Sequence, residues 1–128
     1  MIDHVFVSVR DLHRSGIFYG AALRSLGWSA IGTYRAASGP AGIPDLTGFG
    51  DATGASIWLR DDTSGFSAAH IGFVAPDRAA VDVAYTSARA AGARDNGAPA
   101  VRDYFAPGYY AANVFDPDGN SLEFVAKG

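Results

Sequence analysis

The chain contains an internal repeat, and this repeat constrains its fold more than any other feature of the sequence. The segment HVFVSVRDLHRSGIFY at residues 4–19 aligns with HIGFVAPDRAAVDVAY at residues 70–85, which begins 66 positions later. The segment DATGASIWL at residues 51–59 aligns with DPDGNSLEF at residues 116–124, which begins 65 positions later. Because a repeated sequence folds into a repeated structural unit, we expect two similar modules within a single domain.

Each module is predicted to contain a strand, a helix and three further strands, which makes the fold class α+β. Residues 1–65 form the first module and residues 66–128 the second, within one domain at 1–128. The expected elements are a strand at 2–9, a helix at 12–26 and strands at 28–35, 46–50 and 55–61, then a strand at 69–75, a helix at 78–91 and strands at 93–96, 109–115 and 120–126. Asp11 and Asp77 stand where each helix begins, because an Asp side chain accepts hydrogen bonds from the free N–H groups there.

Alternation along the first strand of each module places two histidines on the same face of the predicted sheet. Val5, Val7 and Val9 point toward the helix, so His4 points to the opposite face. His70 takes the equivalent place in the second module. The simpler interpretation is that each histidine only completes a hydrogen-bond network.

Glu123 shares that face, because Leu122 and Phe124 take the helix side of the last strand. If the two modules lay their sheets side by side about a pseudo-twofold axis, Glu123 converges with His4 and His70 in one concavity. Two imidazoles and a carboxylate can hold a divalent metal and leave its other positions open. We therefore expect a metal site, against the simpler reading in which Glu123 faces water at a sheet edge.

The repeated unit and four motifs resemble the vicinal oxygen chelate superfamily, also called the glyoxalase/bleomycin-resistance/extradiol-dioxygenase group. The motifs are IDHV at the start, FYGAALRSLGW in the first helix, AAHIGFVAPDRAAV at the second start and FDPDGNSLEF at the end. The resemblance covers essentially the whole chain. It implies two βαβββ modules that form a cupped mixed sheet with the helices on its outer face.

The resemblance also implies that His4, His70 and Glu123 are the metal ligands, because the family takes its ligands from the first and last strands of each module. The fourth place falls at Trp58, which cannot ligate a metal. This pattern is similar to extradiol dioxygenases and fosfomycin-resistance thiol transferases, whereas glyoxalase I proper has a fourth protein ligand. Fe, Mn, Zn, Ni and Co all fit the three-ligand set.

We expect an enzyme that chelates a small substrate through two adjacent oxygens, with lyase, transferase and dioxygenase chemistry all open. Glu123 and Tyr110 are the candidate groups for proton transfer. The predicted substrate-binding residues are aromatic or cationic: Trp58, Phe6, Arg102, Tyr104 and Tyr109. The alternative is a non-catalytic protein that sequesters an aromatic small molecule, as bleomycin-resistance proteins do. A third interpretation is a dimerisation module, and a homodimer is expected in every case.

Composition narrows the classes of partner. The net charge is -3, and the 10 Lys and Arg residues are scattered, so we expect no nucleic-acid partner. The chain has no Cys, which excludes thiolate ligands and suits a reducing cytoplasm. We expect no membrane association, because no apolar run is long enough to span a bilayer. Asp11, Asp77 and Asp116 are interpreted as cap and turn residues, without a chemical role.

Overall fold

The computed structural model describes residues 2–62 and 68–127. The predicted boundary between the modules, at residues 65 and 66, lies outside the described residues. The elements of the first module are β1 (Val5–Val9), α1 (Leu12–Ala22), η1 (Arg24–Leu26), β2 (Ser29–Tyr34), η2 (Ala36–Ser38), β3 (Leu46–Asp51) and β4 (Gly54–Asp61). Those of the second are β5 (His70–Val74), α2 (Arg78–Ala90), β6 (Arg94–Asp95), β7 (Ala100–Val101), β8 (Tyr110–Phe115) and β9 (Ser121–Ala126).

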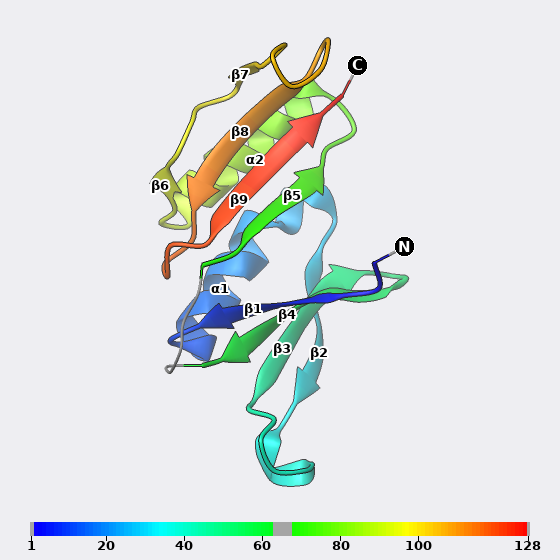
Figure 1. Cartoon of the computed structure of the whole chain (residues 1–128), viewed down its shortest axis with the longest axis vertical. Helices are drawn as coiled ribbons and strands as arrows, with labels where there is room; N and C mark the ends of the chain where they lie inside the picture. Colours follow the sequence, from blue (N-terminus) through cyan, green and yellow to red (C-terminus); the bar gives the residue numbers. More distant parts are fainter. Residues whose placement is uncertain (1, 63–67, 128) are drawn as a thin grey trace.

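The strands form two sheets with matching topology, as Figure 1 shows. The first sheet has the order β1-β4-β3-β2, and the second has the order β5-β9-β8-β6, with the short strand β7 also pairing with β8. In each sheet the first strand of the module runs parallel to its last strand, and the remaining pairs are antiparallel. The α+β fold of two repeated units is therefore confirmed, with the mixed sheet divided into two.

The helices begin where the sequence predicts, because both caps form. The Asp11 carboxylate accepts from the Arg14 N–H at 2.9 Å, and the Asp77 carboxylate accepts from the Ala80 N–H at 2.8 Å. The helix expected at residues 12–26 is α1 followed by the 3-10 turn η1. No described helix meets the length and apolar character that a membrane crossing requires.

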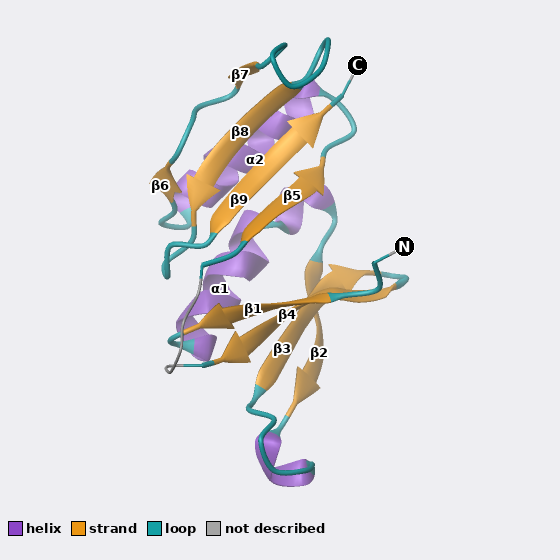
Figure 2. Ribbon diagram, viewed as in Figure 1, coloured by secondary structure: helices purple, strands orange, loops and turns teal. Residues whose placement is uncertain are grey.

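Both modules contribute to one hydrophobic core between the helices and the sheets (Figure 2). Tyr19 of α1 and Val81 of α2 are fully buried in it. Trp28 meets the ring of Phe73 edge-on, with 5.5 Å between centroids, and so joins the first module to the second. Phe73 is 5% exposed, and burying a phenylalanine side chain typically contributes about 1.5–3 kcal/mol. The interface between the modules is therefore part of the folded core.

The turn between β8 and β9 fastens the second module to the first. Asp116 is 1% exposed, and its carboxylate accepts from the Tyr19 hydroxyl at 2.8 Å. The side chain of Asp118 accepts from the Ser15 hydroxyl at 3.3 Å and lies 3.4 Å from the Arg14 guanidinium. Asn120 donates to the carbonyl of Ser8 at 3.2 Å. Asp116 is a turn residue as predicted, but it also holds the two modules together.

In the described part of the chain, each sheet carries its helix on one face and leaves the other uncovered. Figure 2 looks onto the uncovered face of β5, β9 and β8, with α2 behind it. The side chains that alternate away from the core emerge on this uncovered face, and Phe73 and Phe124 are buried on the other. Alternation along the strands predicts His4, His70 and Glu123 on these uncovered faces.

Candidate functional site

His70 and Glu123 meet on the uncovered face of the second sheet. The parallel pairing of β5 with β9 sets Gly72 beside Glu123 and His70 beside Ser121. His70 Nε2 lies 3.2 Å from Glu123 Oε1, and its Nδ1 lies 2.8 Å from the Ser121 hydroxyl. Glycine at position 72 leaves room in front of the carboxylate, since nothing lies within 4 Å of the place that a Cβ would occupy there. The two predicted ligands are therefore neighbours.

Tyr109 contacts the other carboxylate oxygen of Glu123. Its hydroxyl donates a short hydrogen bond to Glu123 Oε2. This bond to the carboxylate, followed by partial burial, raises the pKa of Tyr109 to about 12. The phenol therefore stays protonated at neutral pH and acts as a donor. With a side chain only 12% exposed and both oxygens engaged, Glu123 has a fixed orientation.

His4 lies on the other sheet. Its Nδ1 is 2.6 Å from the carboxylate of Asp3, and its side chain is 46% exposed. The rings of His4 and Phe6 are 5.7 Å apart between centroids. Phe6 is 48% exposed on the uncovered face of the first sheet. The histidine that the repeat pairs with His70 thus contacts Asp3 through Nδ1, and no group of three metal-binding side chains forms around it among the described residues.

Trp58 forms an aromatic platform on that same face, at the position equivalent to Glu123. The register places it between Phe6 on β1 and Gly48 on β3. A Cβ at Gly48 would lie 2.8 Å from the indole, and a Cβ at Gly32 would lie 2.7 Å from it. Real Cβ atoms do not approach this closely. The two glycines therefore allow the indole to lie flat across the sheet, where its outer side can stack on a planar ring.

The loop between β7 and β8 carries the predicted cation and two more aromatic rings. Arg102 Nη1 lies 3.5 Å from the Tyr104 hydroxyl. Tyr104 is 75% exposed and packs against Phe105, with 4.7 Å between the ring centroids. Phe105 in turn lies 5.3 Å from the ring of Tyr109. The aromatic rings of this loop therefore form a continuous series of contacts from Tyr104 through Phe105 to Tyr109, which donates a hydrogen bond to Glu123.

Tyr110, a candidate group for proton transfer, lies away from the Glu123 carboxylate. Its hydroxyl donates to Asp82 of α2 at 2.6 Å. The physical reason is alternation along β8: Asn113 faces Glu123 across the ladder, and Tyr110 takes the opposite side with the buried residue Ala112. Tyr109, one position earlier, is the tyrosine at Glu123. The Tyr110 hydroxyl is thus bonded to Asp82 and not to Glu123, and its part in proton transfer stays a prediction.

The three predicted metal ligands do not converge within one chain. Across residues 2–62 and 68–127 there is no group of three His, Cys, Asp or Glu side chains that could hold a metal ion. The donor chemistry of His70 and Glu123 fits a divalent cation, because their donor atoms already lie 3.2 Å apart on an open face. Within one chain, two of the three predicted donors lie side by side, and His4 lies on the other sheet.

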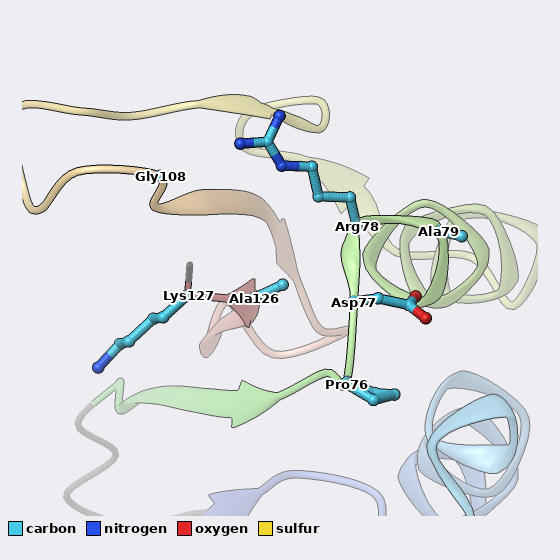
Figure 3. Close-up of a pocket in the computed structure, with 7 residues that line it drawn as sticks. All are labelled: Pro76, Asp77, Arg78, Ala79, Gly108, Ala126 and Lys127. Atoms are coloured by element: carbon cyan, nitrogen blue, oxygen red, sulfur yellow. The ribbon is translucent and has the colours of Figure 1, made fainter.

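A separate hollow lies at the start of α2, as Figure 3 shows. It is lined by Pro76, Asp77, Arg78, Ala79, Gly108, Ala126 and Lys127. Asp77 points toward the helix that it caps, and the Lys127 side chain extends away from α2. None of the predicted site residues lines this hollow, so it is distinct from the His70 and Glu123 pair.

Comparison with known proteins places the chain in a family. The sequence profile of the Glyoxalase/Bleomycin resistance protein/Dioxygenase superfamily matches residues 1–124. A glyoxalase/bleomycin resistance protein from Albidiferax ferrireducens T118 is 23% identical, covers 98% of each chain and has a TM-score of 0.76. A glyoxylase/bleomycin resistance protein/dioxygenase domain from Frankia sp. EAN1pec is 21% identical over 100% of this chain and 98% of that one, with a TM-score of 0.75.

A lactoylglutathione lyase from Agrobacterium tumefaciens is 21% identical, covers 98% of this chain and 92% of its own, and has a TM-score of 0.66. No curated protein sequence matches the chain significantly. At these identities the solved structures show a shared fold.

Proposed function

Because the chain belongs to the Glyoxalase/Bleomycin resistance protein/Dioxygenase superfamily, we propose that it is a divalent-metal-dependent enzyme that binds a small substrate through two adjacent oxygens. The observation that carries this proposal is the contact between His70 Nε2 and Glu123 Oε1 at 3.2 Å on an uncovered sheet face. A bound divalent ion would supply Lewis-acid stabilisation of a developing oxyanion on the substrate. Fe, Mn, Zn, Ni and Co are the candidate ions.

We propose that a second copy of the chain supplies His4. The residue lies on an uncovered face with its ring half-exposed, and among the described residues of one copy it belongs to no group of three metal-binding side chains. An uncovered face of the first sheet placed against that of the second sheet in another copy would bring His4 to His70 and Glu123. A twofold dimer then contains two such sites, each built from both copies.

The chain's own residues divide the remaining tasks. Glu123 is the candidate proton acceptor, a role that would require its carboxylate to leave the metal transiently. Tyr109 fixes the orientation of that carboxylate through the bond to Oε2. Trp58 and Phe6, brought by the same copy as His4, would supply an apolar wall for a planar part of the substrate. Arg102 and Tyr104 would line the rim.

Metal content tests the proposal directly. Protein purified without chelator is analysed for transition metals, alongside His70→Ala and His13→Ala. His13 is the matched control, because it lies in the first turn of α1 and outside the proposed ligand set. We expect one metal per chain in the parent and in His13→Ala, and loss of that metal in His70→Ala. A parent chain that stays metal-free when Zn²⁺, Mn²⁺ and Fe²⁺ are each supplied refutes the proposal.

Ligand binding by the His70→Ala variant separates the enzyme from the binding-protein alternative. A protein that only sequesters an aromatic ligand needs the platform of Trp58 and Phe6 but not the pair of His70 and Glu123. Such a protein would bind aromatic compounds equally well after His70→Ala. An enzyme that chelates its substrate through the metal would lose substrate binding together with the metal.

A further inference from the structure

Both predicted ligand histidines are held through the same ring atom. Asp3 contacts Nδ1 of His4 at 2.6 Å, and the Ser121 hydroxyl contacts Nδ1 of His70 at 2.8 Å. In each case Nε2 is the nitrogen that remains directed away from the holding residue. The two contacts arise differently, because Asp3 precedes its histidine in sequence while Ser121 reaches His70 through the parallel pairing of β5 and β9.

We propose that Asp3 and Ser121 are positioning residues that present Nε2 of the two histidines to the site. This inference rests on the proposed function, since it assigns the support of the same metal ligands. A histidine that binds a metal through one nitrogen commonly donates the N–H of the other to a carboxylate or another oxygen, which fixes the tautomer and the ring orientation. Asp3 and Ser121 are placed to accept those two hydrogen bonds.

The two positioning residues differ in the histidine tautomers that they permit. An ionised carboxylate only accepts hydrogen bonds, so Asp3 holds His4 in the tautomer that carries its hydrogen on Nδ1. A hydroxyl both donates and accepts, so Ser121 can stay bonded to His70 in either tautomer. When Nε2 of His70 donates to Glu123, Ser121 donates to Nδ1; when Nε2 must offer a lone pair, Ser121 accepts from Nδ1. The tautomer of His4 is therefore fixed by Asp3, whereas His70 can adopt either tautomer.

The tautomer of His4 can be read in the metal-free chain by nitrogen-15 correlation spectra of the imidazole rings at a pH where histidine is neutral. We expect His4 to carry its hydrogen mainly on Nδ1. The His13 ring has no hydrogen-bond partner among the described residues, so His13 serves as the internal reference. Its hydrogen should lie mainly on Nε2, as in free histidine. Asp3→Ala should convert the His4 signal to the His13 pattern. A His4 signal that already matches His13, or one that Asp3→Ala leaves unchanged, overturns the inference.

The role of Ser121 is read from the affinity for Zn²⁺ alone, measured by calorimetry. Loss of an outer hydrogen bond to a ligand typically weakens metal binding about 10–100-fold, and we expect this for Ser121→Ala. Ser121→Thr keeps the hydroxyl and should bind Zn²⁺ as the parent does. Equal affinity in Ser121→Ala refutes the positioning role. If the parent binds no Zn²⁺, the proposed function fails, whereas the metal-free His4 spectra still decide the inference.

Discussion

Removing the hydroxyl of Tyr19 should cost far more stability than removing that of Tyr85, although the repeat makes the two positions equivalent. Both hydroxyls donate to an aspartate at 2.8 Å, Tyr19 to Asp116 and Tyr85 to Asp95. Tyr19 is fully buried and Asp116 is 1% exposed, while Tyr85 is only partly buried and Asp95 is exposed. The chemical change is identical in the two variants, so burial is the variable that differs.

The expected loss of stability follows from this difference in burial. A hydrogen bond to a charged group contributes about 1.5–3 kcal/mol, and a buried acceptor cannot replace the lost donor with water. Tyr19→Phe should therefore lower the free energy of unfolding by about 2 kcal/mol, which corresponds to a melting temperature about 6–10 °C lower for a chain of this length. Tyr85→Phe should change the free energy of unfolding by less than about 0.5 kcal/mol.

Urea denaturation followed by circular dichroism measures both variants under one condition. The slope of the transition should be unchanged, so that the shift in midpoint reports stability alone. Equal losses in the two variants, or no loss in Tyr19→Phe, would show that the turn at Asp116 is not docked against α1. The account of how the modules are joined would then be refuted.

Two further changes test the platform and the buried tyrosine. Gly48→Ala would place a Cβ 2.8 Å from the Trp58 indole, so we expect a loss of about 1–3 kcal/mol and a change in tryptophan fluorescence that is absent from the Trp58→Phe background. Gly72→Ala, a strand glycine with nothing within 4 Å of the added Cβ, is the control, and a similar loss there would contradict the close contact. Burial, followed by the charge of Asp116, raises the pKa of Tyr19 above 10.0 in the folded chain. The stability from this group is therefore complete below pH 10.0 and falls as the pH rises through the raised value, so the difference between the parent and Tyr19→Phe in urea should shrink above pH 10.0. A difference that is constant across this range would contradict the raised pKa.

Local sequence patterns predicted much of the fold because the features concerned are local. The repeat set the order of the elements, and the caps at Asp11 and Asp77 form as expected. Alternation also put His70 and Glu123 on one uncovered face, where the parallel register brings their side chains together. These outcomes depend on residues close in sequence or on one ladder.

The remaining features depend on where whole elements meet. Tyr109 and Tyr110 are adjacent, and the pairing of Asn113 with Glu123 decides which of them reaches the carboxylate. The burial of Asp116 requires the turn to dock against α1, which no pattern within the turn indicates. The distance between His4 and His70 likewise depends on how the sheets are placed, because neither strand pairs with the other.

The measurement that bears most directly on the proposed site is subunit mixing between His4→Ala and His70→Ala. If each site takes His4 from one copy and His70 with Glu123 from the other, neither variant alone holds a metal. A mixed dimer then has one intact site and one that lacks both histidines. After equal amounts of the two variants exchange subunits freely, metal content should return to about a quarter of the parent value. A mixture that stays metal-free while the parent binds metal would contradict a site shared between two copies.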